Sequence, residues 1–415
     1  MDKCTTKITL AEYFIPLDPN FLSSLLKKYD LDRYTKKFDS IAAMKLFIFA
    51  QLMQIKHYVD ISQKLNNNRK LQKTIGLSSI STSQLCRKWR NIDHKVLEQV
   101  YRQLVQQVIS RFGVAKANAK LGMIHMVDST TITLCLNQHR WATYSKHKGA
   151  IRVHTRFNRN SDVGFPDEVL LTSGSVADRT LMDDLVVVEE GALNVFDRGY
   201  VDYEKFDAYC KQSVRFITRL RHNASYKVLE EREVKPNTNG LKDAVILLGY
   251  RTCKRMENNV RLIQCKEDSG EEMLICTNDF DTPAEEIREI YRRRWKIEMF
   301  FKWIKQHLHV KNFYGRSPNA VYNQIYAALI AFCLTLLMQA NVHHKGTMLE
   351  LVKQIRLSWD DRFQRFLQAL FPPPGRTSKG RRRQKDAELV YAETCQQVAD
   401  GEADYLDEMS QEFLM

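Results

Sequence analysis

One segment of the chain carries four polar residues whose types and spacing suit the binding of a phosphate group beside a metal ion. Tyr291, Arg294, Glu298 and Lys305 are separated by 3, 4 and 7 residues, so at about 100° per residue they fall within a ~60° stripe of a helix. Apolar residues at helical spacing lie beside the stripe and predict a buried face. One carboxylate among basic residues indicates a metal ligand next to a phosphate-binding surface, although a solvated, salt-bridged helix is the commoner outcome for a charged run.

Two aspartates elsewhere in the chain stand at the ends of predicted strands. Asp128 follows the apolar run MIHMV, and Asp197 follows LNVF. If these strands are neighbours, the two carboxylates meet at one edge of the sheet, where Glu298 can complete the set. Three carboxylates are hard oxygen ligands that suit Mg²⁺ or Mn²⁺, and a pair of such ions stabilises both the attacking and the leaving oxygen of a phosphodiester. Each aspartate alone is weak support because strand-end Asp is common in turns, so the prediction rests on the combination.

The elements that must position these residues are predicted from apolar runs and turn signals. The segment Thr282–His309 reads as one long helix, with an N-cap threonine and a first-turn proline at its start. From Gly122 the order is three strands, helix, strand, helix, strand, which predicts an α/β domain on a mixed sheet. Consecutive strands within 221–280 predict an antiparallel β insertion before the helix that carries Glu298.

The N-terminal region is predicted to be helical and allows two interpretations. A helix, a turn and a second helix that opens with Gln84, Arg87, Lys88 and Arg90 are typical of a helix-turn-helix DNA reader. A plain helical bundle used for packing or dimerisation fits the pattern equally well. The predicted parts of the chain are 1–118 (N-terminal helical, DNA-binding or dimerisation), 119–220 (first part of the catalytic core), 221–280 (β insertion), 281–345 (second part of the core), 346–371 (C-terminal helical segment) and 372–415 (linker, basic cluster and acidic tail).

Charge and cysteine content indicate a protein of a reducing compartment with an anionic partner, which from charge alone could be DNA, RNA, a ribosome or an anionic membrane. The net charge is +14, and the chain up to Lys385 carries all 63 basic residues with 40 of the 49 acidic ones, which favours a polyanionic partner. The nine cysteines are scattered without a CxxC pair, as in cytosolic proteins. The apolar run Ile325–Met338 is short for a membrane span and predicts a buried core helix. We therefore expect a cytoplasmic protein that needs no membrane.

These motifs together resemble a known family. The sequence is similar to the DDE transposases of bacterial insertion sequences, in the IS-four group, which carry a Tyr, two residues, Arg, three residues, Glu, six residues, Lys signature. Tyr291, Arg294, Glu298 and Lys305 match it at every spacing, and VDSTTI and FDRGY look like the two Asp motifs of the family. The resemblance extends from about Gly122 to Met338.

The resemblance implies both a fold and a reaction. The fold would be an RNase H-like mixed sheet flanked by helices, in which Asp128, Asp197 and Glu298 hold two divalent ions, Mg²⁺ or Mn²⁺. The reaction would be hydrolysis of DNA at the terminal inverted repeats of the element, followed by attack of the freed 3′-hydroxyl on target DNA. Synapsis of two ends implies a homodimer on double-stranded DNA.

The resemblance also assigns DNA contacts. Tyr291, Arg294 and Lys305 would contact phosphates of the transposon end. Family members with a β insertion cut the second strand through a DNA hairpin and can use a tryptophan to hold a flipped base. No tryptophan occurs within 221–280, which leaves Tyr226 and Tyr250 as alternatives.

Several further residues have both a functional and a structural interpretation. Lys146, Lys148 and Arg152 belong to a basic loop and strand that would add phosphate contacts, or would touch nothing on an exposed strand. Arg198 would orient a phosphate or pair with an acid. We expect His125, Trp295 and Trp303 to be core residues.

Two other functions remain open from the sequence. An RNase H-like nuclease would use the same three acids and cut DNA without joining it. A DNA-binding protein with a silent site would keep its cellular role after Asp128→Asn. The acidic tail from Asp386 is expected to restrain DNA binding by folding over the basic surface.

Overall fold

The computed structural model describes residues 7–112, 123–159, 164–233, 241–250, 255–266, 270–308 and 313–371. Residues up to Leu370 form one compact unit, and the chain from Phe371 forms a second. The predicted linker, basic cluster and acidic tail lie outside the described residues.

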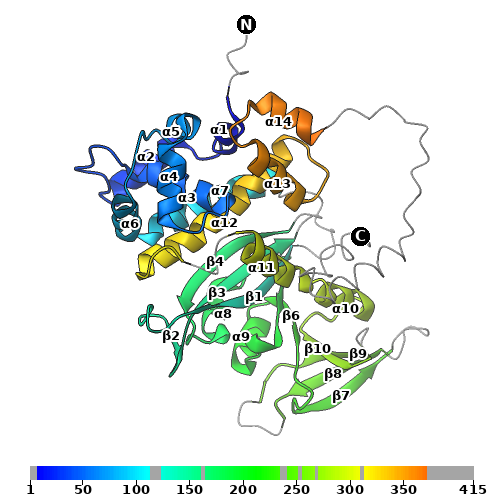
Figure 1. The fold of residues 1–415 in the computed structure, drawn as a ribbon. Helices are drawn as coiled ribbons and strands as arrows, with labels where there is room; N and C mark the ends of the chain where they lie inside the picture. Colours follow the sequence, from blue (N-terminus) through cyan, green and yellow to red (C-terminus); the bar gives the residue numbers. More distant parts are fainter. Residues whose placement is uncertain are drawn as a thin grey trace, which may run out of the picture. The chain divides into compact units, whose positions relative to one another are not determined.

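A mixed sheet of ten strands runs through the first unit (Figure 1). Strand β1 (Ile124–Leu134) pairs antiparallel with β3 (Lys148–Arg159) and parallel with β5 (Leu193–Phe196), which pairs parallel with β6 (Arg215–Arg219). Strand β3 also pairs with β2 (Thr143–Ser145) and β4 (Phe165–Ser173). The order β4-β3-β1-β5-β6 has three antiparallel strands followed by two parallel ones, so the predicted RNase H-like mixed sheet is confirmed.

The strands predicted as a β insertion continue this sheet. Strands β7 (Tyr226–Arg232), β8 (Lys242–Leu248), β9 (Val260–Lys266) and β10 (Glu272–Thr277) pair antiparallel in succession. Strand β10 then pairs antiparallel with β6. The insertion therefore extends the sheet at the β6 edge and returns the chain beside the core, just before the helices that carry Glu298.

Alternating side chains of the central strands fill two separate cores, because successive residues of a strand point to opposite faces. Met126, Leu193 and Val195 pack with helices α7 (His94–Phe112), α11 (Trp295–His307) and α12 (Pro318–Asn341). Val127 and Phe196 pack on the other face with α8 (Met182–Leu185) and α9 (Tyr203–Lys211). Strand β5 is buried on both faces, as expected of a strand with two parallel neighbours covered by helices.

The helical region was also predicted. Its elements are α1 (Thr9–Tyr13), α2 (Pro19–Lys28), α3 (Ser40–Leu52), α4 (Tyr58–Asn66), α5 (Arg69–Ile75) and α6 (Thr82–Asn91), followed by α7 and, after α12, by α13 (Met348–Ser358) and α14 (Phe363–Leu370). In α6, Gln84, Arg87 and Arg90 are exposed, whereas Lys88 pairs with Asp32. Packing and DNA reading therefore both remain possible interpretations of this region.

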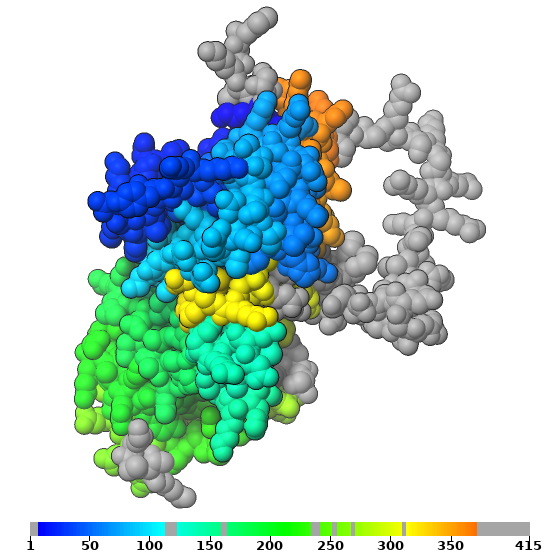
Figure 2. Space-filling view, turned by 60° about the vertical axis from the view of Figure 1, so that its left-hand side comes forward, coloured from blue at the N-terminus to red at the C-terminus, as the bar shows by residue number. Residues whose placement is uncertain are grey.

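Helix α12 is the element that joins the helical region to the sheet. It lies between the N-terminal helices and the sheet in the space-filling view (Figure 2), and the Trp89 indole N–H donates to the Ala320 carbonyl 3.1 Å away. By length and composition it is the one helix among the described residues that could cross a membrane, but 94% of its most apolar window is buried inside the protein. The predicted buried core helix is confirmed.

Candidate active site

Asp128 and Asp197 lie at the same edge of the sheet. Strands β1 and β5 are paired in parallel register up to Val127 and Phe196. Asp197 follows the last residue of β5, whereas Asp128 lies inside β1, which continues to Leu134, so the prediction that Asp128 ends its strand was wrong. Because the β1–β5 pairing stops one residue before each aspartate, the two carboxylates still lie side by side at this edge of the sheet. The sequence argument required these strands to be neighbours, and the structure shows that they are.

The segment predicted as one long helix is two helices. Helix α10 (Ala284–Arg292) ends before Arg293, and α11 begins at Trp295. At the break, the Arg294 N–H bonds the Tyr291 carbonyl at 3.0 Å and the Ile297 N–H bonds the Arg294 carbonyl at 3.1 Å, so i→i−3 bonds replace the i→i−4 ladder. The prediction of a continuous helix was wrong because a regular spacing of apolar residues does not reveal a single tightened turn.

The start of this segment also differs from the prediction. Thr282 is buried and its hydroxyl donates to the Asp279 carboxylate at 2.7 Å, while the residue that precedes α10 is Pro283. Asp279 also accepts from the Thr282 N–H. Asp279, one turn upstream, thus fixes the entry into α10 in place of the predicted threonine N-cap.

The break places Arg294 among all three predicted acids. Its guanidinium donates to Asp128 Oδ2 at 2.9 Å and to Glu298 Oε1 at 2.6 Å. Asp197 Oδ1 lies 3.9 Å from the same guanidinium. The structure therefore brings Asp128, Asp197 and Glu298 together around one cation.

The acids carry more negative charge than this cation neutralises. Burial raises the pKa of Asp128 to about 7, and the charges of Asp197 and Glu298 add to the effect, although Arg294 opposes it. The pKa of Arg294 is raised: burial lowers it, but Tyr291 and the aspartates outweigh that effect. A further cation beside these carboxylates would be stabilised by the excess negative charge.

The donor chemistry fits a divalent ion, whereas the observed arrangement holds a guanidinium in its place. Carboxylate oxygens are the ligands that Mg²⁺ and Mn²⁺ prefer. Within the described ranges, no group of three or more His, Cys, Asp or Glu side chains is close enough to form a metal site as it stands.

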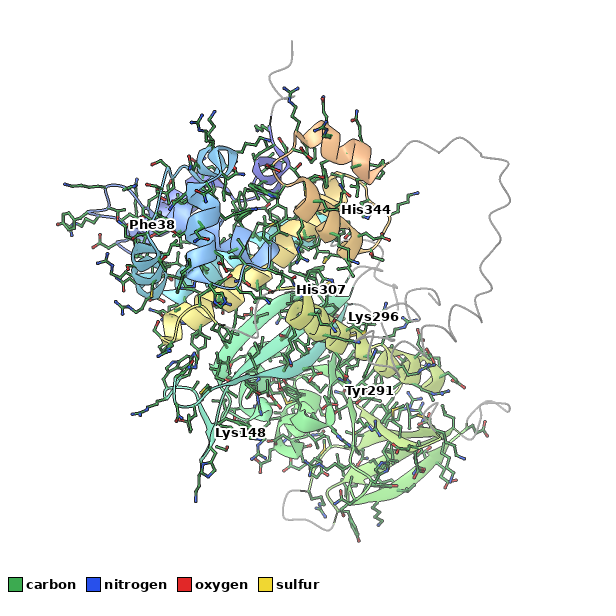
Figure 3. The ribbon with its side chains drawn as sticks, viewed as in Figure 1. Phe38, Lys148, Tyr291, Lys296, His307 and His344 are labelled. Atoms are coloured by element: carbon green, nitrogen blue, oxygen red, sulfur yellow. The ribbon has the colours of Figure 1, made fainter. Side chains whose placement is uncertain are left out.

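Lys305 of α11 contacts β1, and Tyr291 is buried near the end of α10, just before the helix break. The Lys305 ammonium donates to the Thr130 hydroxyl at 2.5 Å and to the Thr131 carbonyl at 3.2 Å, so it follows β1 beyond Asp128. Tyr291 is only 5% exposed, and burial raises its pKa to about 12. Tyr291, Lys296 and His307 mark the course of α10 and α11 in Figure 3.

A comparison with protein families identifies the domain. The model of the family described as "Transposase DDE domain" matches residues 122–334, half of the chain. The chain belongs to this family. The resemblance seen in the motifs is thereby confirmed, and members of the DDE transposase family generally use divalent metal ions.

Curated relatives of this DDE transposase domain are also transposases by name. A probable transposase for insertion sequence element IS5377 of Geobacillus stearothermophilus is 30% identical and covers 51% of this chain and 55% of its own. A putative transposase, y4zB, of Sinorhizobium fredii is 32% identical over 51% and 60%. A putative transposase for element IS4SA of Synechocystis is 24% identical over 48% and 56%. The chain spans just over half the length of the curated relatives it matches.

Among solved structures, a piggyBac transposase synaptic complex with hairpin DNA aligns with a TM-score of 0.44 and 11% identity, covering 91% of this chain and 84% of that one. This similarity is too low to bear on the function of the chain.

The remaining predicted residues of this DDE domain occupy different environments. Lys146 and Lys148 are exposed on the hairpin between β2 and β3, with Lys148 at the far side of the sheet from Tyr291 (Figure 3). Arg198 is exposed in the turn after Asp197. Arg152 is largely buried and donates to the Val176 carbonyl at 3.1 Å, so it is held by the protein.

Of three predicted core residues, His125 is buried, Trp303 is partly buried against the core, and Trp295 is exposed. Trp303 packs edge-on against Phe332 with ring centres 5.2 Å apart, and His125 is 2% exposed. Trp295 is 56% exposed, so its predicted core packing was wrong. Trp295 is the first residue of α11, and the helix break turns the first turn of α11 so that this side chain faces solvent.

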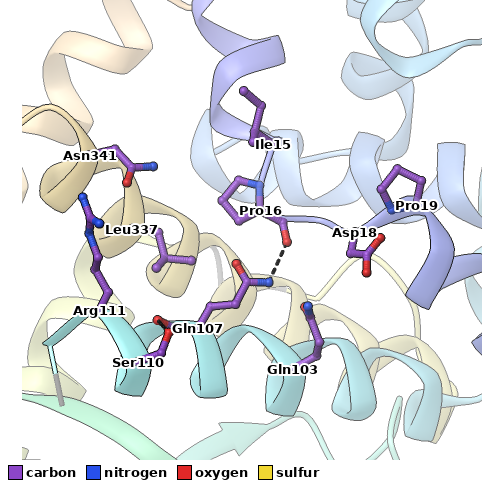
Figure 4. A pocket seen from close by; sticks show the side chains of 10 residues that line it. All are labelled: Ile15, Pro16, Asp18, Pro19, Gln103, Gln107, Ser110, Arg111, Leu337 and Asn341. Carbon is purple, nitrogen blue, oxygen red and sulfur yellow. Dashed lines mark hydrogen bonds between the residues drawn. The ribbon is translucent and has the colours of Figure 1, made fainter.

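One hollow of this chain lies away from the acids. A cavity of about 570 Å³ is formed by the turn between α1 and α2 together with α7 and α12 (Figure 4). Gln107 crosses it and donates to the Pro16 carbonyl at 2.9 Å. None of the residues that line it is a predicted site residue, so we assign the chemistry to the carboxylate edge of the sheet.

Sequence reasoning missed Asp178 and Tyr200. Asp178 lies at the carboxylate edge, bonded to Ser129, and Tyr200 is buried in the turn that follows Asp197. The available signal was the position of Asp178 shortly after a predicted strand, the same context as Asp128 and Asp197.

Proposed function

We propose that this chain is an insertion-sequence transposase that cuts double-stranded DNA at the terminal inverted repeats of its element and transfers the 3′-hydroxyl ends to target DNA. The observation that carries the proposal is the convergence of Asp128, Asp197 and Glu298 on Arg294, at the edge of an RNase H-like sheet in a member of the DDE transposase family. Cleavage and joining are the same in-line displacement at phosphorus, with water and then a hydroxyl as the nucleophile.

Asp128, Asp197 and Glu298 would hold two divalent ions, Mg²⁺ or Mn²⁺. Such ions, when bound, supply an activated oxygen nucleophile and offset the charge on the leaving oxygen. Arg294 pairs with the acids in the structure, and its guanidinium has the planar donor fork that binds a phosphate. Release from the carboxylates would bring it to the scissile phosphate. Lys305, which donates to the Thr130 hydroxyl on β1, would contact the DNA backbone next to the scissile phosphate.

The hairpin between β2 and β3 would bind DNA at a distance from the acids. From Asp128 to Leu134, six residues of β1 span roughly 20 Å, and Leu134 pairs with Gly149 at the hairpin. The Trp141 indole N–H donates to the Arg316 carbonyl at 2.7 Å and so anchors the segment that leads into this β-hairpin. Lys146 and Lys148 make no ion pair with any residue that the structure describes, so their charges are available to phosphates about six base pairs from the cleavage site.

Replacing Lys146 and Lys148 together with Gln is expected to lower the salt dependence of DNA binding. Each lost phosphate contact removes about 0.9 from the slope of log K against log salt, so the slope should fall by about 2, with cleavage at saturating DNA unchanged. Fluorescence anisotropy at several salt concentrations measures it. The control is Lys205→Gln with Lys211→Gln, because these cations already pair with Asp183 and Glu257. An equal change in both double variants would contradict a specific role for the hairpin.

The other regions complete the proposal. The N-terminal helices would bind DNA or join two copies into a synaptic homodimer, with Gln84, Arg87 and Arg90 exposed on α6. In the β insertion, Tyr250 is 44% exposed, so it is the better placed of the two alternative tyrosines for stacking on a flipped base. The protein would act in the cytoplasm at the nucleoid.

A joining assay tests the function. A duplex that carries the terminal inverted repeat followed by flanking DNA is labelled at the 5′ end of the strand whose 3′-hydroxyl the cut exposes, and is incubated with the protein, Mg²⁺ and a plasmid target. Cutting at the repeat end and transfer of label to the plasmid are expected. Cutting without transfer would indicate the RNase H-like nuclease, and binding without cutting would indicate a silent DNA-binding protein.

A further inference from the structure

We propose that Asp178 is a positioning residue of this site: it fixes the part of β1 that carries Asp128 by holding the hydroxyl of Ser129. The inference rests on the proposed function for its catalytic meaning. It concerns a residue outside the three acids and outside the Tyr-Arg-Glu-Lys set.

Strand β1 needs support at this point because its pairing is one-sided beyond Val127. The register between β1 and β5 ends at Val127 and Phe196, while β3 continues on the other side, with Thr155 opposite Asp128. Among the strands that the structure describes, none pairs with Asp128 and Ser129 on the side where the chemistry takes place. On that side, side-chain contacts must hold this part of β1.

Asp178 supplies the missing contact. The Ser129 hydroxyl donates to Asp178 Oδ1 at 2.5 Å. The Ser129 N–H in turn donates to Asp128 Oδ1 at 2.7 Å. The carboxylate of Asp178 thus holds the residue whose backbone orients the carboxylate of Asp128.

Asp178 is itself held from β3. Arg152 lies 3.3 Å and His154 Nδ1 lies 3.4 Å from Asp178 Oδ1. These two residues are two positions apart on β3 and therefore share a face of the sheet. His154 is fully buried, and its Nε2 lies 2.9 Å from the Thr172 hydroxyl. Burial raises the pKa of Asp178, but His154, Ser129 and Arg152 outweigh it and the pKa is lowered. The carboxylate is a fixed, charged acceptor.

The second oxygen of Asp178 faces the segment that carries the other aspartate. A Cβ placed on Gly199 would lie 3.6 Å from Asp178 Oδ2 and 3.8 Å from Asp197 Oδ2. Asp178 therefore stands between the turn after β5 and the part of β1 that carries Asp128. Its first oxygen already accepts the Ser129 hydrogen bond and lies at ion-pair distance from Arg152, so it acts through Ser129 and not as a reacting group.

The test compares Asp178→Asn, Ser129→Ala and their combination in the full chain. Loss of a contact that orients a metal ligand typically costs about 10- to 100-fold in metal affinity or activity. Each variant is expected to bind Mn²⁺ roughly 10-fold or more weakly by calorimetry and to lose a similar factor in single-turnover cleavage. DNA affinity and melting temperature should stay close to those of the wild type. The combination should be no worse than the more severe single variant, because both remove one contact.

The controls separate this role from a general loss of structure. Ser129→Thr keeps the hydroxyl and should retain Mn²⁺ affinity. Asp183→Asn removes a nearby acid that binds Lys205 and Tyr209 instead, and should leave both readouts unchanged. If Asp178→Asn does not fold, Ser129→Ala alone decides the matter, since it removes only one oxygen.

Wild-type Mn²⁺ affinity in both single variants would overturn the inference, and so would losses that multiply in the combination. The Mn²⁺ measurement does not need cleavage. A wild-type chain that binds Mn²⁺ but cuts no DNA would therefore count against the proposed function while the positioning role is still decided.

Discussion

Glu298→Gln is expected to abolish cleavage of the terminal repeats in Mg²⁺ while leaving DNA binding intact. The substitution keeps the size of the side chain but removes one of the three charges around Arg294. Metal ions stabilise the transition state by several kcal/mol, so loss of a ligand should slow cleavage by roughly 10³-fold or more. Single-turnover cleavage measures the rate, and gel shift measures binding.

Glu289→Gln is the matched control for this substitution. Glu289 lies on α10 and forms an exposed pair with Arg292, an arrangement worth little. Its cleavage rate should equal that of the wild type. Full cleavage by Glu298→Gln would sink the assignment of this residue as a metal ligand.

Arg294→Gln is expected to have the second largest effect, on stability as well as on activity. The Arg294 side chain is 13% exposed and faces three acids, and removing one partner of a buried ion pair costs roughly 3 kcal/mol or more. In EDTA the melting temperature should therefore fall. Added Mn²⁺ should raise it more than in the wild type, because no guanidinium has to be displaced from the carboxylates.

Cleavage by Arg294→Gln should fall by about 10²-fold or more even when Mn²⁺ restores stability, since loss of one preorganised donor to a reacting group has that magnitude. Arg293→Gln is the control. Arg293 is the neighbouring residue in the break, is exposed, and forms no ion pair with the described part of the chain. Equal stability of Arg294→Gln and the wild type in EDTA would mean that Arg294 does not compensate the acids.

The two expected results separate two roles that share one cluster. Glu298 would hold a metal ion, and Arg294 would take the place of that ion until DNA and metal arrive. Mn²⁺ should raise the melting temperature of Arg294→Gln more than that of the wild type, and should not raise that of Glu298→Gln. This pair of results would distinguish an exchange of cations from a simple loss of packing.

Much of the site could be predicted from the sequence because its signals are local. An apolar run followed by Asp needs only a few consecutive residues to be recognised, as at MIHMV before Asp128 and LNVF before Asp197, although β1 continues past Asp128 to Leu134. The spacing of Tyr291, Arg294, Glu298 and Lys305 is likewise contained in one segment. The α/β fold follows from the order of such segments, and the core helix α12 follows from its composition.

The tertiary structure decided what depends on contacts between distant segments. It broke the predicted helix at Arg293 and Arg294, turned Trp295 to the surface, and placed Arg294 on the acids where a phosphate contact was expected. It also brought Asp178 to Ser129, 49 residues away in sequence, which no periodicity records.

The physical reason is that periodicity reports which face of an element is apolar, whereas the partner of a polar side chain is set by which elements become neighbours. By itself the sequence determined which residues could bind metal and phosphate, from Asp128 to Lys305. Only the folded sheet decided that those acids converge on Arg294 beside β1.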